Sequence, residues 1–223
     1  MREALRKFLH DNGLSLALLA FFAISQIGLS VTGLYHHNDE QRAHGAHMLT
    51  YGEYLHSAAF LEATMENWES EFLQMFVYVI FTVRLYQRGS AESKPPEGSV
   101  EVDADPRFEV LTPRTPWPVK RGGWVLSVYE RSLGLALLLL FLISFALHAI
   151  GGAALYSEEQ LQHGEAPVTA LQYLGTAQFW FESLQNWQSE FFSIAVMVLL
   201  TVVLRQRGSP ESKPVATPHL ESG

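Results

Sequence analysis

The residues best suited to chemistry lie in a six-residue segment, Asn-Trp-x-Ser-Glu-Phe, that occurs twice in the chain. Each copy places a carboxylate, a hydroxyl and an amide directly before an apolar run. A carboxylate within the hydrocarbon of a membrane is costly unless it is paired or protonated. Two such carboxylates with one imidazole nearby could bind a proton or a hard cation, or transfer a proton. The candidate residues of this ion or proton site are Glu71, Glu190, His148, Asn67, Asn186, Ser70 and Ser189.

The same residues also admit a purely structural interpretation, and the sequence leaves both open. Trp68 and Trp187 are typical interfacial anchors, so the neighbouring glutamates could mark where each helix leaves the lipid. Asn and Ser side chains also form interhelical hydrogen bonds that serve packing alone.

Histidines before the second apolar run of each half form a second candidate site. Glu40 and His44, like Glu159 and His163, are four residues apart and would share a helix face. A divalent metal could use these four residues as ligands. The alternative is a solvated loop, because a histidine near a helix C-terminus is favoured by the helix dipole.

The elements that must position these residues are apolar helices. Leu14–Tyr35 carries no formal charge, and Leu133–Ser157 has His148 as its only residue that titrates near neutral pH. Runs of this length predict membrane spans, because about 20 helical residues cross a ~30 Å hydrocarbon layer. Shifting the chain by 119 places aligns 14–95 with 133–214 without a gap, with 36 identities in 82 positions. The sequence therefore predicts a tandem repeat.

Each repeat ends with a shorter apolar segment, Phe72–Val83 or Phe191–Leu204. Both are too short to span alone, so their helices must begin upstream and include Asn67–Glu71 and Asn186–Glu190. Two spans per repeat would make the repeats parallel, related by an axis along the membrane normal. A cleaved signal peptide is disfavoured for the first span, because its equivalent recurs inside the chain.

The distribution of basic residues predicts the orientation. Fourteen of the 15 Lys and Arg residues lie on the side of both termini, and Arg42 alone lies on the other. Cytoplasmic loops carry the excess of Lys and Arg, so both termini are expected in the cytoplasm.

The loops on the outer side carry helix start and stop signals. Ser, Thr or Asn followed three residues later by Glu or Gln is the capping-box pattern, and a following Gly favours a helix stop. We expect short capped helices at the pairs Asn38 and Gln41, Ser157 and Gln160, Thr50 and Glu53, and Thr169 and Gln172, with stops at Gly45 and Gly164.

The predicted organisation is all-α: a polytopic membrane protein with four transmembrane helices, as two parallel two-span repeats with short capped helices outside. The domains are a first repeat at 1–95, a cytoplasmic linker at 96–131, a second repeat at 132–214 and a cytoplasmic tail at 215–223. The Pro-, Gly- and acid-rich linker is expected to have little regular structure.

Composition excludes several classes of function. The chain has no Cys, so thiolate catalysis and Cys-based metal sites are excluded. Its net charge of −8 argues against nucleic acid as a partner. No phosphate-binding glycine loop or nucleophile elbow occurs, so we expect neither a cofactor nor enzymatic activity.

Three motifs present in both halves, [DE]-E-Q-x-x-H-G, N-W-x-S-E-F and Q-R-G-S-x-E-S-K-P, resemble a family of bacterial integral membrane proteins of unknown function. The resemblance covers both repeats and implies a four-span protein of the bacterial inner membrane. It brings no activity, substrate or cofactor.

Two classes of function therefore remain. The first is a non-enzymatic membrane scaffold or accessory subunit, in which the polar stripes fasten helices together. The second is a small proton or cation transporter or channel that uses Glu71 and Glu190. The expected partners are the lipid bilayer and either further copies of the chain or another membrane protein.

Overall fold

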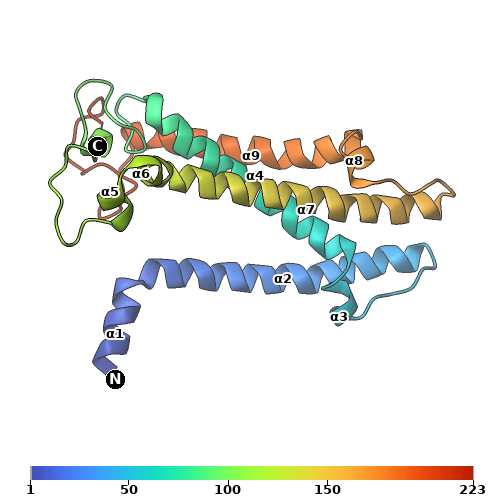
Figure 1. Cartoon of the computed structure of the whole chain (residues 1–223). Helices are drawn as coiled ribbons and strands as arrows, with labels where there is room; N and C mark the ends of the chain where they lie inside the picture. The colour runs from blue at the N-terminus through green and yellow to red at the C-terminus, as the bar shows by residue number, and fades with distance from the viewer. Residues whose placement is uncertain (1, 223) are drawn as a thin grey trace. The chain divides into compact units, whose positions relative to one another are not determined.

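The structure, a computed structural model, describes residues 2–222. The described chain is helical and contains no strand, as Figure 1 shows. Four helices are long: α2 (Gly13–Ala43), α4 (Ala58–Arg84), α7 (Ser132–Gln162) and α9 (Ala177–Val203). The others are α1 (Arg2–Asp11), α3 (Tyr51–Tyr54), η1 (Glu101–Asp103), α5 (Trp117–Arg121), α6 (Gly123–Tyr129) and α8 (Ala170–Tyr173).

Three of the long helices, α2, α7 and α9, are long and apolar enough to cross a membrane. Helix α4 has the same length as α9, 27 residues, but contains four glutamates before its apolar half. The prediction that the second apolar segments begin upstream is correct, since α4 and α9 start at Ala58 and Ala177. At 1.5 Å per residue each is about 40 Å long, enough to cross the ~30 Å hydrocarbon layer.

The chain divides into two compact units whose boundaries fall inside α4, α7 and α8. One unit comprises residues 1–64 and 150–170, and the other comprises 65–149 and 171–223.

Small residues bring helices together in the first unit. A Cβ added to Gly151 of α7 would lie 2.9 Å from the backbone nitrogen of Glu62 in α4, so the two backbones are in close contact. A Cβ on Gly33 of α2 would lie 2.2 Å from the hydroxyl of Tyr54, a buried side chain of α3. Small residues at such crossings are typical of helices that pack within membranes.

The loop after α2 is fastened in a way that the sequence did not predict. Asn38 was expected to cap a new helix, but α2 continues past it to Ala43. Its side chain instead donates to the carbonyl of Leu49 at 2.8 Å and accepts from the Leu49 amide at 2.7 Å. Ser157 makes the corresponding pair of bonds with the backbone of Val168, at 3.2 and 2.9 Å. The two predicted capping boxes at these residues are therefore wrong, because both side chains lie inside continuous helices and bind the returning chain.

Other signals in these loops are confirmed. Gly45 and Gly164 have φ of 67° and 78°, and the residue after each glycine donates its amide five residues back, to Gln41 and Gln160 respectively. These bonds satisfy terminal carbonyls of α2 and α7. Thr50 and Glu53 form the predicted capping box at the start of α3.

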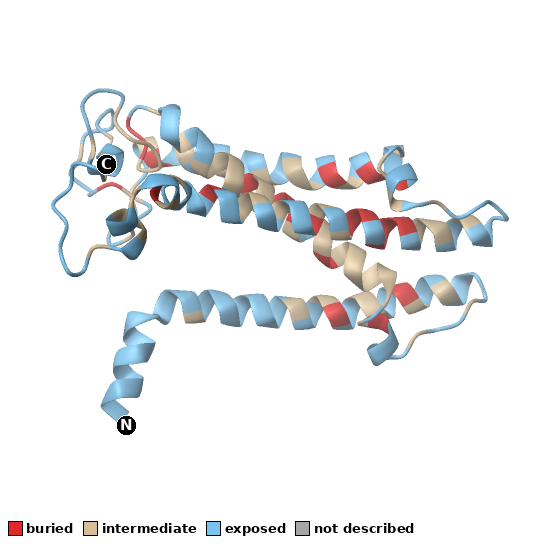
Figure 2. Ribbon diagram, viewed as in Figure 1, coloured by how far each residue is buried: buried red, intermediate tan, exposed pale blue. Residues whose placement is uncertain are grey.

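In the second unit, the inner face of α9 packs on α7 through aromatic rings. Phe179 is fully buried, and its ring centroid lies 5.3 Å from that of Phe145 in an edge-to-face arrangement. Trp187 lies two turns further along α9 and contacts Phe141 with centroids 6.5 Å apart. Figure 2 shows buried positions concentrated along this part of α7 and the beginning of α9.

The repeated motif Gln-Arg-Gly-Ser-x-Glu-Ser-Lys-Pro folds into the same loop after α4 and α9. In the first copy the amide of Gln87 donates to Ser93 Oγ at 2.8 Å, and the amide of Glu92 donates to Ser90 Oγ at 3.0 Å. The motif serines therefore hold the turn itself together. The second copy repeats both bonds, from Gln206 to Ser212 at 2.9 Å and from Glu211 to Ser209 at 3.2 Å.

The motif lysines bind different segments. Lys94 donates to the carbonyl of Val83 and to Asp103, at 3.0 and 2.7 Å. Lys213 is buried, and its ammonium donates to three carbonyls of the C-terminal tail, those of Pro218, His219 and Glu221, at 3.2, 2.9 and 2.7 Å. Burial lowers the pKa of Lys213.

The tail also reaches the first motif copy. The amide of Gly89 donates to Ser222 Oγ at 3.1 Å, and a Cβ at Gly89 would lie 2.1 Å from the carbonyl oxygen of His219. With φ of 83°, Gly89 is required both by its backbone conformation and by this close approach. The linker holds short helices η1, α5 and α6, so it is more regular than its composition predicts.

Candidate functional site

The most unusual site of the second unit is a buried histidine between two carboxylates. His148 lies near the middle of α7, and its side chain has no solvent exposure. Its Nδ1 lies 2.7 Å from Glu69 Oε2 of α4, and its Nε2 lies 3.4 Å from Glu182 Oε2 of α9. We call these three residues the His148 cluster.

Further donors fix the carboxylates of the His148 cluster. The indole Nε1 of Trp187 donates to Glu69 Oε1 at 3.0 Å. The hydroxyl of Tyr173 in α8 donates to Glu182 Oε2, and the amide of Gln178 donates to Glu182 Oε1. Each glutamate thus accepts hydrogen bonds at both oxygens, as an ionised carboxylate can.

Helix geometry explains how these residues meet. Gln178 and Glu182 are four residues apart in α9 and lie on adjacent turns of one face. Thr176 caps α9 by accepting from the amide of Phe179 at 3.2 Å, which fixes the first turn of the helix beside α8. Phe179 in turn stacks on the imidazole of His148, with ring centroids 4.8 Å apart.

The geometry also suits a charged cluster. Both nitrogens of His148 face carboxylate oxygens, so a doubly protonated imidazolium could donate to both. Glu69 is fully buried, and the Glu182 side chain retains 16% exposure. The cluster therefore combines two carboxylates and one exchangeable imidazole proton, and Glu182 is its most accessible member.

Positions equivalent under the 119-residue shift carry no such cluster. They are Leu29 for His148, Gln188 for Glu69 and Ala63 for Glu182. The cluster therefore has residues from both copies but no counterpart under the repeat, and identical positions of the two copies do not point to Glu69 or Glu182. The sequence signal for both residues is an ionisable residue in one copy that aligns with an apolar or amide residue in the other copy.

Helices α4 and α9 meet beside the predicted residues Glu71 and Glu190, and neither residue contacts His148. The Gln74 side chain of α4 donates to the carbonyl of Glu190 at 2.7 Å and to Ser193 Oγ of α9 at 3.4 Å. Gln74 and Ser193 are themselves equivalent positions, so α4 and α9 meet at matching levels. His148 bonds to Glu69 and Glu182, not to Glu71 or Glu190.

The other predicted site residues have varied surroundings. Asn186 donates to Glu66 of α4. Ser70 is buried and donates to the carbonyl of Asn67 at 2.8 Å, whereas Asn67 is exposed. Ser189 is also exposed and donates to the carbonyl of Asn186 at 2.8 Å.

The outer histidines bind their own helix ends. Nδ1 of His44 lies 2.9 Å from the carbonyl oxygen of Glu40, and Nδ1 of His163 lies 2.8 Å from that of Glu159. All four candidate metal ligands are exposed, and each histidine contacts a backbone oxygen rather than the glutamate carboxylate.

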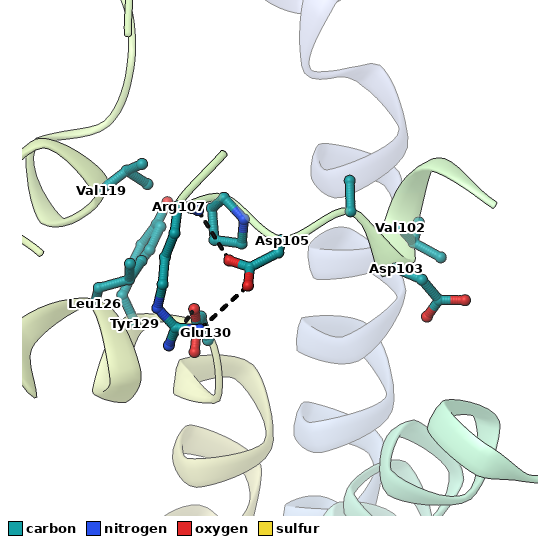
Figure 3. Close-up of a pocket in the computed structure, with 10 residues that line it drawn as sticks. Val102, Asp103, Asp105, Arg107, Val119, Leu126, Tyr129 and Glu130 are labelled. Carbon is teal, nitrogen blue, oxygen red and sulfur yellow. Dashed lines mark hydrogen bonds and ion pairs between the residues drawn. The ribbon is translucent and has the colours of Figure 1, made fainter. Parts of the chain in front are cut away.

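A separate cavity of about 460 Å³ lies within the linker, between residues 102–107 and α6. Figure 3 shows Arg107 beside Asp105 and Glu130, with nitrogen–oxygen distances of 3.3 and 3.5 Å. Because both carboxylates already face Arg107, the cavity has no free cationic group for an anionic ligand.

Comparison with protein families matches residues 5–223 to the model described as "Domain of unknown function (DUF6766)". No curated protein and no solved structure matches the chain. The match covers nearly the whole sequence, and the chain therefore belongs to the DUF6766 family.

Proposed function

We propose that this chain is a proton-binding membrane protein that moves protons through the His148 cluster. The observation that carries the proposal is a fully buried imidazole with one carboxylate at each nitrogen. Ionisable groups inside membrane spans are costly and typically mark ion pathways or proton relays.

Stability alone is a poor explanation for such a cluster. A buried ion pair or triad loses solvation, and well-packed apolar residues of similar volume are often equally or more stable. The equivalent positions Leu29, Gln188 and Ala63 lack ionisable groups, so the fold does not require charge at these places. A proton moving between imidazole and carboxylate is the simplest use of the arrangement.

The topology proposed with this function has four spans, with α4 as the fourth. Both termini and the linker lie in the cytoplasm of a bacterial cell, at its inner membrane, as the bias of Lys and Arg supports. The absence of Cys makes a clean test available. In intact cells, the Ser99→Cys variant should not be labelled by an impermeant maleimide, and the Glu165→Cys variant should be labelled. The reverse pattern of labelling would contradict this orientation.

Proton movement can be tested with purified protein in vesicles that contain a pH-sensitive dye. Under a potassium-driven membrane potential, the wild-type chain should acidify or alkalinise the lumen faster than empty vesicles. Glu69→Gln, and the triple variant that combines His148→Leu with Glu69→Gln and Glu182→Gln, should each reduce this rate at least tenfold. Glu165→Gln removes a carboxylate from an exposed loop position and should leave the rate unchanged.

The second candidate function is a non-transporting membrane scaffold or accessory subunit. The exposed polar residues Asn67, Glu71 and Ser189 on α4 and α9 favour it, because a partner could cover them. Wild-type vesicles without proton flux in either direction of the gradient would overturn the transport proposal in favour of this one.

A further inference from the structure

Helix α1 (Arg2–Asp11) is amphipathic, and its apolar face is exposed. Leu5, Phe8 and Leu9 are three or four residues apart and therefore lie together on one face of the helix. Their exposed fractions are 57%, 54% and 51%, and no residue of α1 is buried. An amphipathic helix normally buries its apolar face, so the face of α1 is available to bind something apolar.

The rest of the surface of α1 carries free positive charge. Arg2, Arg6 and Lys7 make no ion pair and no side-chain hydrogen bond with the residues that the structure describes. The acidic residues of α1 have other roles. Asp11 lies 3.2 Å from the neighbouring histidine ring, and Glu3 lies in the first turn, where the helix dipole favours a carboxylate. The three cations are therefore available to bind anions.

The junction with α2 holds α1 beside the membrane boundary. The charge-free run Leu14–Tyr35 has 22 residues, about 33 Å of helix, which matches the ~30 Å hydrocarbon layer. When α2 crosses the membrane, Leu14 lies at the boundary, and α1 ends three residues before it. The ten residues of α1 extend about 15 Å, so the whole helix lies close to the lipid headgroups.

Asn12 ends α1 and separates its direction from that of α2. The side-chain amide and the backbone amide of Asn12 both donate to the carbonyl of Phe8, at 2.9 and 3.0 Å, which satisfies a terminal carbonyl of α1. The carbonyl of Asn12 in turn accepts from the amide of Leu16 at 3.0 Å, in the first turn of α2. Figure 1 shows α1 turned away from the axis of α2. A helix that leaves the axis of a span at the membrane boundary is placed to lie along the membrane surface.

We propose that α1 lies in the surface of the membrane that α2 enters and binds the headgroups of anionic lipids there. Leu5, Phe8 and Leu9 enter the boundary between headgroups and acyl chains, and the three basic side chains contact lipid phosphates. Amphipathic helices with a basic polar face bind membranes in this way, and each cation near an anionic surface adds to the attraction. Binding of α1 to lipid requires neither the His148 cluster nor proton movement.

The test uses the full chain in lipid vesicles, with one cysteine at a time introduced in α1 and modified with a nitroxide spin label. The chain has no Cys of its own, so each label reports one position. Collisions with oxygen, which concentrates among acyl chains, measure exposure to lipid, and collisions with a water-soluble nickel complex measure exposure to water. The labelled variants of the apolar face are Leu5→Cys, Phe8→Cys and Leu9→Cys. Glu3→Cys and His10→Cys label the opposite face and leave all three cations in place.

In vesicles of phosphatidylcholine with phosphatidylglycerol, the ratio of oxygen to nickel collisions should be highest at positions 5, 8 and 9 and lowest at positions 3 and 10. In vesicles of phosphatidylcholine alone, which have no net charge, the ratio at position 8 should fall about threefold or more. Added salt should reduce the difference between the two lipid compositions, because it screens the attraction.

Two further variants, each made with the label at position 8, assign the lipid preference to α1. The first neutralises the three basic residues of α1: Arg2→Gln, Arg6→Gln and Lys7→Gln. The second removes three exposed positive charges of the linker: Arg114→Gln, Lys120→Gln and Arg121→Gln. The first variant should lose the difference between the two lipid compositions, and the second should retain it.

Three results would overturn the proposal. Frequent nickel collisions at all five positions in both lipid compositions would place α1 in water. Few collisions with either reagent at positions 5, 8 and 9 would show that protein, such as a second copy of the chain, covers the apolar face. Equal ratios in the two lipid compositions would show that anionic headgroups are not what α1 binds.

Discussion

Replacing His148 by Leu, the residue at the equivalent position 29, should strongly destabilise the protein. The substitution leaves Glu69 and Glu182 beside each other without the imidazolium that lies between them. Removing one partner of a buried charge pair costs about 3–5 kcal/mol, because the remaining charge stays buried. At about 1.4 kcal/mol per tenfold, the unfolding equilibrium should shift by roughly two to three and a half orders of magnitude.

The companion variant combines His148→Leu with Glu69→Gln and Glu182→Gln. Both amides retain an oxygen that can accept from Trp187 and Tyr173, while no charge remains in the cluster. Replacing a buried ionic triad by uncharged residues often leaves stability unchanged or raises it. The free energy of unfolding of this variant should therefore be at most about 2 kcal/mol below that of the wild-type chain, or above it.

Equilibrium unfolding by SDS in mixed micelles, followed by tryptophan fluorescence, measures both variants. The His148→Leu variant also loses the ring that stacks on Phe179, which lowers its free energy of unfolding independently of charge. Because the triple variant loses the same ring, the difference between the two free energies of unfolding isolates the effect of charge. A single variant as stable as wild type, or a triple variant as unstable as the single one, would refute the reasoning.

Three further predictions concern other parts of the chain. Gly151→Ala should destabilise by about 1–3 kcal/mol in the same unfolding assay, because its Cβ would meet the Glu62 backbone; Gly28→Ala, with open space around it, should be neutral or slightly stabilising, and equal effects would contradict the close crossing. The hydrogen bonds from the Thr50 backbone and side chain lower the pKa of Glu53. Their contribution to the stability of the α3 capping box is therefore present at neutral pH and is lost as pH falls through the usual glutamate range to the lowered pKa. Exchange of the Thr50 amide should accelerate on acidification, and Glu53→Gln should remove that dependence. Burial, with repulsion from Glu211, raises the pKa of Glu92, so folding stability falls as pH rises from the usual glutamate range through the raised pKa. Glu92→Gln should raise the Tm at neutral pH and make the Tm less dependent on pH. A lower Tm would contradict the burial penalty.

The helices were predictable because their signals are local. Charge-free runs located α2 and α7, and the requirement for about 20 residues extended α4 and α9 upstream of their apolar halves. Glycine stops and the Thr50 capping box were also predictable, since each depends on a few neighbouring residues.

Contacts between distant segments were less accessible. Asn38 fits a capping pattern, but its bonds to Leu49 depend on how the loop returns over α2. His148 was predicted to share a site with Glu71 and Glu190, but its partners come from α4 and α9 at positions that the repeat does not share. Sequence periodicity identifies a helix face, but it does not reveal which of several glutamates lies opposite a given histidine.

The lysine that holds the C-terminal tail has a practical consequence for protein engineering. Lys213 binds three carbonyls within the last residues of the described chain, and Ser222 accepts from Gly89. A purification tag or fluorescent protein joined directly to this tail would pull on the segment that connects both motif loops. A long flexible spacer between the tail and the tag would leave the tail in place. A tag before α1 avoids the tail altogether, so a fusion on the α1 side is the better choice for production and imaging.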